Sequence, residues 1–285
     1  MNVFLMPNMT KKDAQLHTER IVDRLHDCGA SVSMDERYRA VFPGRSILFY
    51  KDFYKGLDGC DFVIAVGGDG TIIHAAKHAA MAGKPVLGVN VGRLGFVAGL
   101  EVNELERLDD LVANKYDLEE RLMLQVDLLQ GNTCNVYFAL NDAVISRGSL
   151  SRILDFHVLF NRSNMSDYRA DGLIFSTPTG STAYSLSAGG PVVDPNMECI
   201  LLTPICPHAL FARSVVFNQN AELEVRATCG EDSEIFLTVD GEAAVPVPKG
   251  SVLRIQRAPD TARIVRLKQN NFYEVLNQKL AERRS

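Results

Sequence analysis

The sequence predicts an α/β N-terminal domain, with a Rossmann-like parallel sheet, followed by a mainly antiparallel β domain. Three observations lead to this prediction. An apolar run from Phe62 to Val66 is followed by glycines and then by a helical segment. Short β-type runs dominate from Arg121 to Leu267. A helical ending, Phe272 to Ala281, has apolar residues on one face, and we expect it to return to the first domain.

Strands and helices alternate in the first part of the chain. Val3 to Met6 is expected to be a short strand, and apolar positions from Thr10 to Cys28 follow helical spacing. The run from Phe62 to Val66 is rich in Val and Ile, which is typical of a strand covered on both faces. Thr71 to Ala80 has helical character and Lys84 to Asn90 is the next strand, so the segment forms a βαβ unit with a right-handed crossover. Function is expected at the carboxyl ends of these strands.

The pattern of apolar residues changes beyond a charged helix, about Val102 to Asn114, that we expect to connect two domains. From there, short β-type runs are separated by turn residues and helical periodicity is scarce. These runs include Gln125 to Leu129, Val136 to Leu140, Ile153 to Phe160, Leu223 to Ala227, Ile235 to Val239 and Val252 to Ile255. We therefore expect one domain made of residues 1–119 with 269–285, and a second made of residues 120–268.

Composition and charge are those of an ordinary globular protein. The 285 residues are 46% hydrophobic and 23% charged, with a net charge of −5. Nothing in this charge favours a nucleic-acid partner, and the basic pair Lys11-Lys12 is too small to form a basic stripe. No apolar stretch is long enough to span a membrane, and the chain opens into a strand rather than a signal peptide. Six scattered cysteines are typical of reduced thiols, so we expect a cytoplasmic protein.

Glycines surround an acidic residue in the segment Gly67-Gly68-Asp69-Gly70-Thr71. Glycines let backbone approach a phosphate, and the N-terminus of the following helix favours anions. A phosphate cradle does not need a carboxylate, so Asp69 either takes a proton from an attacking hydroxyl or holds a magnesium ion that bridges phosphates. A plain Asp-Gly turn is the structural alternative. The segment matches neither the P-loop nor the Gly-x-Gly-x-x-Gly pattern of dinucleotide-binding domains.

Two further clusters admit both a functional and a structural interpretation. The segment from Gly88 to Phe96 ends a strand with three glycines and forms either a backbone wall beside the phosphate loop or a tight crossover turn. Asn141-Asp142, between two strand-like runs, could grip ribose hydroxyls or an amide, but such pairs are also common in turns.

The longest candidate stretch runs from Ala170 to Pro191. A buried strand, Leu173 to Phe175, leads into a Pro-x-Gly turn, after which Ser181 or Thr182 is expected to cap a helix. Small residues follow, with Tyr184 among them. Such residues suit a place where a ligand lies close to backbone, whereas a Ser/Thr/Gly-rich surface loop is the alternative.

Taken together, these clusters resemble those of the NAD kinases. The resemblance runs from about Val63 to Glu242 and includes Asp240-Gly241-Glu242 as a late match. The Gly-Gly-Asp-Gly motif is shared with diacylglycerol and sphingosine kinases and, more loosely, with phosphofructokinases, so it indicates phosphoryl transfer only. The segment Thr-Pro-Thr-Gly-Ser-Thr-Ala-Tyr-Ser is far more specific and separates the chain from the lipid kinases.

The resemblance implies a role for each matching position. Asp69 corresponds to the proposed base on the 2′-hydroxyl of the adenosine ribose, and the motif glycines Gly67, Gly68 and Gly70 would hold phosphates. Asn141 and Asp142 would bind NAD, although the family usually has Asn-Glu there. Further positions implied to contact ligand are His74, Asp171, Thr182, Ala183, Tyr184, Ser185, Leu186, Ser187 and Glu242, the last standing where Gln is common. Arg152 and Arg169 match basic positions that reach substrate across a subunit contact.

The implied reaction is transfer of the γ-phosphoryl group of ATP to the 2′-hydroxyl of NAD, which gives NADP. A divalent cation, Mg²⁺, would bridge the phosphates, and the chain would form a homodimer or homotetramer. Two alternatives remain open on the residues. A lipid kinase of the same superfamily would expose an apolar groove and lack the Tyr184 segment. A non-catalytic NAD(H)-binding sensor would bind dinucleotide without turnover.

Overall fold

The computed structural model describes residues 1–92, 94–148, 152–208, 212–230, 234–268 and 272–282. The chain divides into two compact units. Unit 1 contains Met1–Glu120 and Ala262–Ser285, and unit 2 contains Arg121–Thr261.

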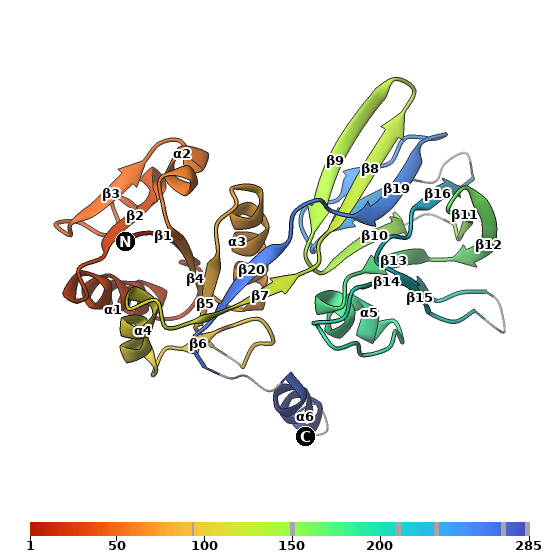
Figure 1. The fold of residues 1–285 in the computed structure, drawn as a ribbon. Coiled ribbons are helices and arrows are strands. Elements are labelled where there is room, and N and C mark those ends of the chain that lie inside the picture. The colour runs from red at the N-terminus through yellow and green to blue at the C-terminus, as the bar shows by residue number, and fades with distance from the viewer. Residues whose placement is uncertain (93, 149–151, 209–211, 231–233, 269–271, 283–285) are drawn as a thin grey trace. The chain divides into compact units, whose positions relative to one another are not determined.

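Unit 1 is built on an eight-stranded sheet in the order β3-β2-β1-β4-β5-β20-β7, with β6 paired to β5 (Figure 1). The pairs from β3 to β20 along this order, and the β5–β6 pair, are parallel. The strands are β1 (Asn2–Pro7), β2 (Ser31–Asp35), β3 (Ile47–Tyr50), β4 (Phe62–Gly67), β5 (Val86–Asn90), β6 (Leu100–Glu101), β7 (Asp117–Arg121) and β20 (Ala262–Arg266). The predicted α/β architecture with a parallel sheet is confirmed.

Helices cover both faces of this sheet because neighbouring residues of the central strands point to opposite sides. The larger α-helices are α1 (Ala14–Asp27), α2 (Phe53–Asp58), α3 (Asp69–Met81), α4 (Leu108–Val112) and α6 (Phe272–Glu282), with short 3₁₀ turns η1 (Glu36–Tyr38) and η2 (Leu105–Arg107). Val3 and Leu5 share a core with residues of α1 and α4. Phe4 points the other way, where its ring meets Phe53 of α2 at 5.7 Å. The side chain of Ile72, in α3, lies directly against Gly88 of β5.

One connecting helix was expected from Val102 to Asn114, but the helical part of this region is shorter in the structure. Only η2 and α4 are helical there. Their buried residues, Leu105, Leu108 and Leu111, complete the core beside α1. The segment therefore packs onto unit 1.

Unit 2 consists of two six-stranded sheets in which neighbouring strands are antiparallel, as predicted. The first sheet has the order β15-β14-β13-β10-β17-β18 and the second β12-β11-β16-β19-β8-β9. The strands are β8 (Leu124–Gln130), β9 (Thr133–Ala139), β10 (Asp142–Arg147), β11 (Leu154–Phe160), β12 (Ser163–Ala170), β13 (Gly172–Ser176), β14 (Cys199–Ile205), β15 (Val215–Asn218), β16 (Leu223–Thr228), β17 (Ile235–Val239), β18 (Val245–Pro246) and β19 (Val252–Arg257). Ile145 and Phe175 of one sheet share a single core with Val126 and Phe156 of the other.

The chain returns from unit 2 to unit 1 at β20, where Ile264 pairs in parallel with Val86 of β5. The sequence placed this return at residue 269, seven residues after the start of the returning segment in the structure. Arg266 shows why β20 belongs to the first sheet: its guanidinium is buried, bonds Glu119 of β7 at 2.8 Å and donates to the carbonyls of Val97 and Ala98.

The segment after β13 differs from the expectation. A 3₁₀ turn, η3 (Thr179–Thr182), comes first, and the helix α5 (Tyr184–Ser187) has only four residues. Ala183 occupies the N-cap position and provides no side-chain hydrogen bond, so the predicted cap by Ser181 or Thr182 is wrong. The Ser181 hydroxyl instead donates to the Val193 carbonyl and accepts from the Val193 N–H.

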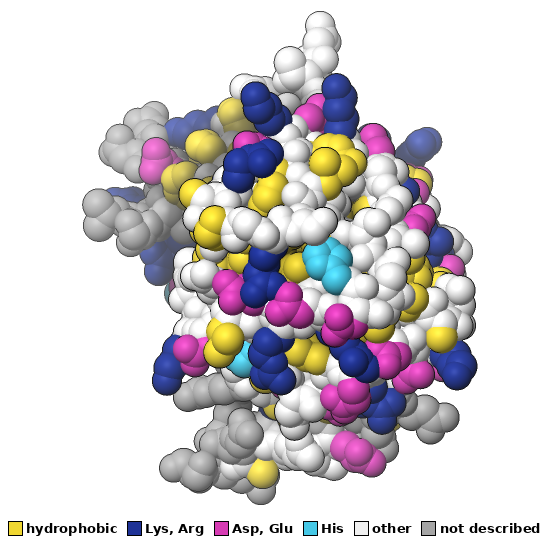
Figure 2. All heavy atoms as spheres, turned by 90° about the vertical axis from the view of Figure 1, so that its left-hand side faces the viewer, with side chains coloured by type: hydrophobic (Ala, Val, Ile, Leu, Met, Phe, Trp, Pro, Cys, Tyr) yellow, Lys and Arg dark blue, Asp and Glu magenta, His cyan; other side chains and the backbone are white. Residues whose placement is uncertain are grey.

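Surface charge, cysteines and helix length bear on the expectations drawn from composition. Figure 2 shows basic and acidic side chains interspersed over the face of unit 1 that it presents. All six cysteines are free thiols. No helix among the described residues is long and apolar enough to cross a bilayer.

Candidate active site

The turn between β4 and α3 carries the glycine-rich motif. Gly67 ends β4, Gly68 is the N-cap of α3, and Asp69 begins the helix. Gly67 must lack a side chain because a Cβ there would collide with the Thr71 side chain. At Gly70 a Cβ would meet nothing within 4 Å, so space is open beside the first turn of α3. This open first turn of a thirteen-residue helix suits an anion.

Asp69 is held by hydrogen-bond donors from a distant segment. Its Oδ2 accepts from the Phe96 N–H at 3.0 Å and its Oδ1 accepts from the Val97 N–H at 3.2 Å. A Cβ at Gly95 would collide with Oδ1, so only glycine permits this approach. The third partner is the ammonium of Lys279, 3.4 Å from Oδ2. Gly95, Phe96 and Val97 thus form a wall beside the motif, here called the Asp69 wall.

A cavity of about 630 Å³, here called the lysine pocket, opens in front of this turn. Gly68, Asp69 and Lys279 line it, together with Lys11, Lys12, Asp13, His17, Asn90, Val91, Gly92 and Leu94. The Lys11 ammonium lies 4.0 Å from the Cβ position of Gly68. Three lysines beside a helix N-terminus give the pocket a positive character that suits a chain of phosphates.

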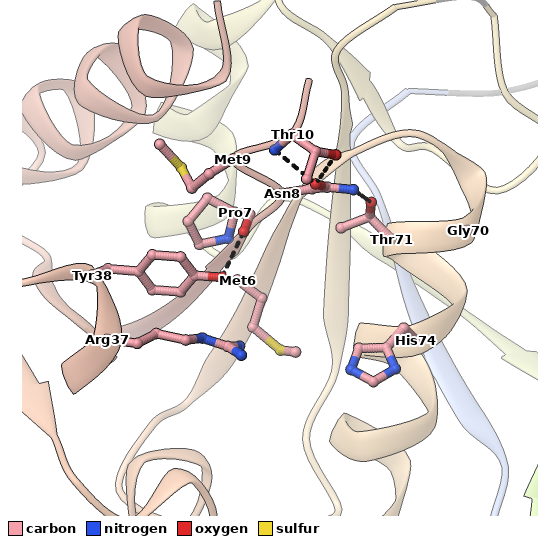
Figure 3. Close-up of a pocket in the computed structure, with 10 residues that line it drawn as sticks. All are labelled: Met6, Pro7, Asn8, Met9, Thr10, Arg37, Tyr38, Gly70, Thr71 and His74. Carbon is pink, nitrogen blue, oxygen red and sulfur yellow. Dashed lines mark hydrogen bonds between the residues drawn. The ribbon is translucent and has the colours of Figure 1, made fainter. Parts of the chain in front are cut away.

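A second cavity of unit 1, about 410 Å³ and here called the β1 pocket, lies at the carboxyl end of β1 (Figure 3). Met6, Pro7, Met9 and Tyr38 give it apolar walls, and the Tyr38 hydroxyl donates to the Pro7 carbonyl at 2.8 Å. Arg37 and His74 approach it from opposite sides in Figure 3. It shares Gly70 and Thr71 with the start of α3, and Asn8 bonds the Thr71 hydroxyl at 2.9 Å.

In unit 2, Asn141 and Asp142 lie where β10 begins, and Asp240 fixes their backbone. The Asp240 carboxylate accepts from the N–H groups of Leu140, Asn141 and Asp142 at 2.9, 2.7 and 3.1 Å. Asp240 itself adopts a left-handed conformation with φ of 48°, in the Asp-Gly turn after β17. On the other side, a Cβ at Gly180 would collide with the Asn141 carbonyl. The Asn-Asp pair is therefore held rigidly from two directions.

These residues line a third cavity, about 450 Å³ and here called the Asp142 pocket. Its other lining residues are Val144, Ser146, Ala183, Tyr184, Thr238, Asp240 and Gly241. The Asp142 side chain is buried, and burial together with the neighbouring Asp240 charge raises its pKa to about 7, despite a hydrogen bond from the Tyr184 backbone. The Tyr184 side chain is 47% exposed and free to meet a ligand.

Comparison with known proteins identifies the family. Residues 3–116 match the model of the ATP-NAD kinase N-terminal domain, and residues 140–267 match that of the C-terminal domain. An NAD kinase of Acetivibrio thermocellus is 37% identical over 285 residues, which cover 99% of this chain and 98% of that protein. An NAD kinase of Symbiobacterium thermophilum is 48% identical over 223 residues, 78% of each chain. The chain belongs to the NAD kinase family. It is therefore a kinase that phosphorylates NAD, and not a lipid kinase.

Solved structures agree on the fold. Yeast NADH kinase, crystallised with NADH, superposes with a TM-score of 0.88 at 24% identity and covers 99% of this chain and 87% of its own. An NAD kinase from Archaeoglobus fulgidus, in complex with ATP, gives 0.76 at 23% identity and covers 99% of both chains.

The residues expected from the family resemblance fall into separate groups. Gly67, Gly68, Asp69 and Gly70 gather at the start of α3, and Asp69 and Gly68 line the lysine pocket. His74 lines the β1 pocket instead. Asn141, Asp142, Ala183 and Tyr184 meet in the Asp142 pocket.

Four expected residues close to Tyr184 in the sequence do not line that pocket: Thr182, Ser185, Leu186 and Ser187. Ser185 is fully buried, and its hydroxyl bonds that of Thr203 at 2.9 Å, so its side chain faces the interior. The Thr182 hydroxyl bonds the Thr179 carbonyl. Leu186 is half-buried and Ser187 is exposed.

Four further residues that were expected to bind ligand also lie outside the Asp142 pocket. Asp171 forms an ion pair with Arg147 at 2.7 Å. Arg169 is exposed on β12 and lies 3.9 Å from Asp155. Arg152 is exposed beside residues 149–151, which lie outside the described part of the chain. Glu242 is exposed, and its N–H donates to the Val239 carbonyl.

Sequence reasoning missed several residues of these cavities. Lys11 and Lys12 form too short a basic run to predict a site, yet both line the lysine pocket. Asp240 belongs to the late match with the NAD kinases, but the match implies no role for it. An Asp-Gly dipeptide after a strand was the available signal, because the turn it makes exposes a carboxylate to nearby N–H groups. Lys279 carried no local signal.

Proposed function

We propose that this NAD kinase transfers the γ-phosphoryl group of ATP to the 2′-hydroxyl of the adenosine ribose of NAD through Asp69 and the lysine pocket. The observation that carries the proposal is a carboxylate at the start of α3, inside a pocket lined by three lysines. The bond between the β–γ bridging oxygen and the γ-phosphorus breaks, and a bond between that phosphorus and the 2′-oxygen forms. Asp69 accepts or orients the hydroxyl proton, and ADP leaves.

Unit 1 has features for both parts of a nucleoside triphosphate. The lysine pocket supplies cations and a helix N-terminus for phosphates. The β1 pocket offers apolar walls and Tyr38 for a flat base, and it touches the same first turn of α3 through Gly70. The complex of the Archaeoglobus fulgidus relative with ATP supports ATP as the donor.

The Asp142 pocket supports recognition of NAD. Carboxylate and amide groups of Asp142 and Asn141 suit ribose hydroxyls or an amide. Tyr184 offers an aromatic surface, and Ala183 leaves room for close contact. The complex of the yeast relative with NADH supports a dinucleotide as the acceptor.

A magnesium ion fits Asp69 as a protein ligand. The described residues contain no group of three or more His, Cys, Asp or Glu that could hold a metal alone. Mg²⁺ commonly binds through one or two carboxylates plus substrate phosphates, so a single carboxylate beside a phosphate pocket suits it. When bound, the ion supplies charge neutralisation on the phosphates. Asp69 then either holds that ion or takes the proton.

The oligomeric state and the cellular compartment belong to the same proposal. Family resemblance supports a homodimer or homotetramer. Six free thiols support a reducing cytoplasm. Light scattering on the purified chain measures the first: a monomeric mass at micromolar concentration contradicts it.

One assay tests the reaction. Purified protein is incubated with NAD, ATP and Mg²⁺, and NADP is measured with an NADP-specific dehydrogenase. We expect NADP only when all three are present, and omission of Mg²⁺ or addition of a chelator should abolish it. Binding of NAD with no NADP formed would instead identify a non-catalytic NAD(H) sensor.

A further inference from the structure

The C-terminal helix α6 carries Lys279, one of the three lysines that line the lysine pocket. It contacts the Asp69 wall at two points. The ring of Phe272 lies 6.0 Å from that of Phe96. One face of α6 then brings Lys279 over the same Phe96 ring, at 4.1 Å from its centroid.

Phe96 therefore links α6 to the motif. Its N–H donates to Asp69 Oδ2, and its ring supports the ammonium that lies 3.4 Å from that same oxygen. An aromatic face attracts a cation and limits where it rests. The ammonium is thus fixed at the one carboxylate to which the proposed reaction assigns chemistry.

We propose that Lys279 binds the phosphate chain of the donor while it remains beside Asp69, so that the C-terminal helix is part of the active site. This inference rests on the proposed function of Asp69. Lys279 lines the lysine pocket together with Lys11 and Lys12, and about a quarter of its side chain is exposed. An ammonium has three donors and can bond a carboxylate oxygen and a phosphate oxygen at once. Its positive charge would offset the repulsion between the Asp69 carboxylate and the phosphate chain.

A purely structural ion pair is the competing explanation. The side chains of Lys279 and Asp69 are 25% and 28% exposed, and ion pairs that reach solvent contribute little to stability. The Phe272–Phe96 contact holds α6 to the wall independently of the charge. A structural role thus predicts a small change in melting temperature and no selective effect on the donor.

The test compares Lys279→Gln with Lys279→Arg, and uses Lys115→Gln as a control at an exposed lysine elsewhere in unit 1. Lys279→Gln should raise KM for ATP about tenfold, the loss expected for one charge-assisted hydrogen bond. KM for NAD should change less than about twofold, because the change touches only the donor. Lys279→Arg keeps the charge and should recover most of the loss. Lys115→Gln should behave like the unaltered protein.

Salt dependence and direct binding make the outcome decisive. Because a cation is lost, KM for ATP in Lys279→Gln should rise less steeply with ionic strength than in the unaltered protein. Calorimetric titration with inorganic tripolyphosphate should show weaker binding to Lys279→Gln than to Lys115→Gln. Equal changes in both KM values, or unchanged tripolyphosphate binding, overturn the proposal.

The two proposals fail in different ways. If the unaltered protein forms no NADP, the proposed function fails, but tripolyphosphate binding still reports on Lys279. If NADP forms normally and tripolyphosphate binds Lys279→Gln as well as it binds the control, only the role of Lys279 is refuted.

Discussion

Two aspartates of the candidate active site, Asp69 in unit 1 and Asp142 in unit 2, have opposite surroundings. Asp69 meets two backbone N–H groups and a lysine. Asp142 is buried at the start of β10, a central strand of its sheet, beside a second carboxylate, Asp240, and its pKa is raised to about 7. Both follow or begin a buried strand, so strand position alone does not distinguish them.

The difference indicates a division of labour. Two backbone N–H groups and the Lys279 ammonium hold the Asp69 carboxylate in place at the start of α3, where it can take a proton or hold Mg²⁺. Burial and like charge around Asp142 favour its neutral form, which can donate a hydrogen bond as well as accept one. A ribose hydroxyl or an amide can be met by either form. Each of the following predictions tests one side of this contrast.

The largest effect is expected at Asp69. Asp69→Asn keeps the shape but loses the charge, so kcat should fall by a factor on the order of 10² or more while NAD still binds. Asp27→Asn, an exposed change on α1, serves as the control. Near-normal turnover would remove Asp69 from the mechanism. Titration of the variant with Mg²⁺ separates the base from the metal ligand, because only loss of a ligand shifts the metal requirement.

A smaller and selective effect is expected at Asn141. Asn141→Ala removes an amide that lines the Asp142 pocket, so KM for NAD should rise by roughly tenfold and KM for ATP should stay nearly constant. Steady-state kinetics with each substrate varied in turn measure this. An equal rise for both substrates would indicate that Asn141 acts through the turn held by Asp240.

Bulk at Ala183 should block the same pocket. Ala183→Leu should weaken NAD binding by roughly 1 kcal/mol or more, the scale of overpacking, and Tyr184→Ala should also weaken it through loss of a stacking surface. Melting curves with and without saturating NAD report both effects, since a ligand stabilises in proportion to its occupancy. A collapse of the ligand-free melting temperature with an unchanged NAD-induced shift would place Ala183 in the core instead.

The smallest effect is a change in how stability depends on pH. Because the pKa of Asp142 is about 7 in the folded chain and 3.8 ordinarily, the folded state binds the extra proton between these values. The free energy of unfolding should therefore fall as pH rises from about 4 to about 7, and stay level above. Asp142→Asn should remove this fall, so the melting temperature of the variant minus that of the unaltered protein should be larger at pH 8 than at pH 5, by about 2 °C or more. Parallel pH profiles of the two proteins would contradict the raised pKa.

Local patterns predicted much of the fold and the centre of each site. A run of five apolar residues, Phe62 to Val66, predicts a buried strand, and β4 is buried along its whole length. The glycines after it predict a turn, and at Gly67 that turn has no room for a larger residue. Lys279 could not be predicted, because it meets Asp69 across 210 residues of chain and only the folded helix brings them together. The ligand-binding role predicted for Ser185 has a related weakness, because a small polar residue suits a ligand and an interior partner equally well. In the structure its partner is the interior residue Thr203 on β14.

The position of β20 has a consequence for how the chain is made. This strand stands between β5 and β7 in the first sheet, yet it follows the whole of unit 2 in the chain. During synthesis on a ribosome, unit 2 emerges complete before unit 1 receives its missing strand. Until then the backbone N–H and C=O groups of β5 and β7 that face β20 are unpaired, and Glu119 lacks its ion-pair partner Arg266. Premature termination after unit 2 and before β20 would therefore leave a finished unit 2 attached to an open sheet that is prone to pair with other chains.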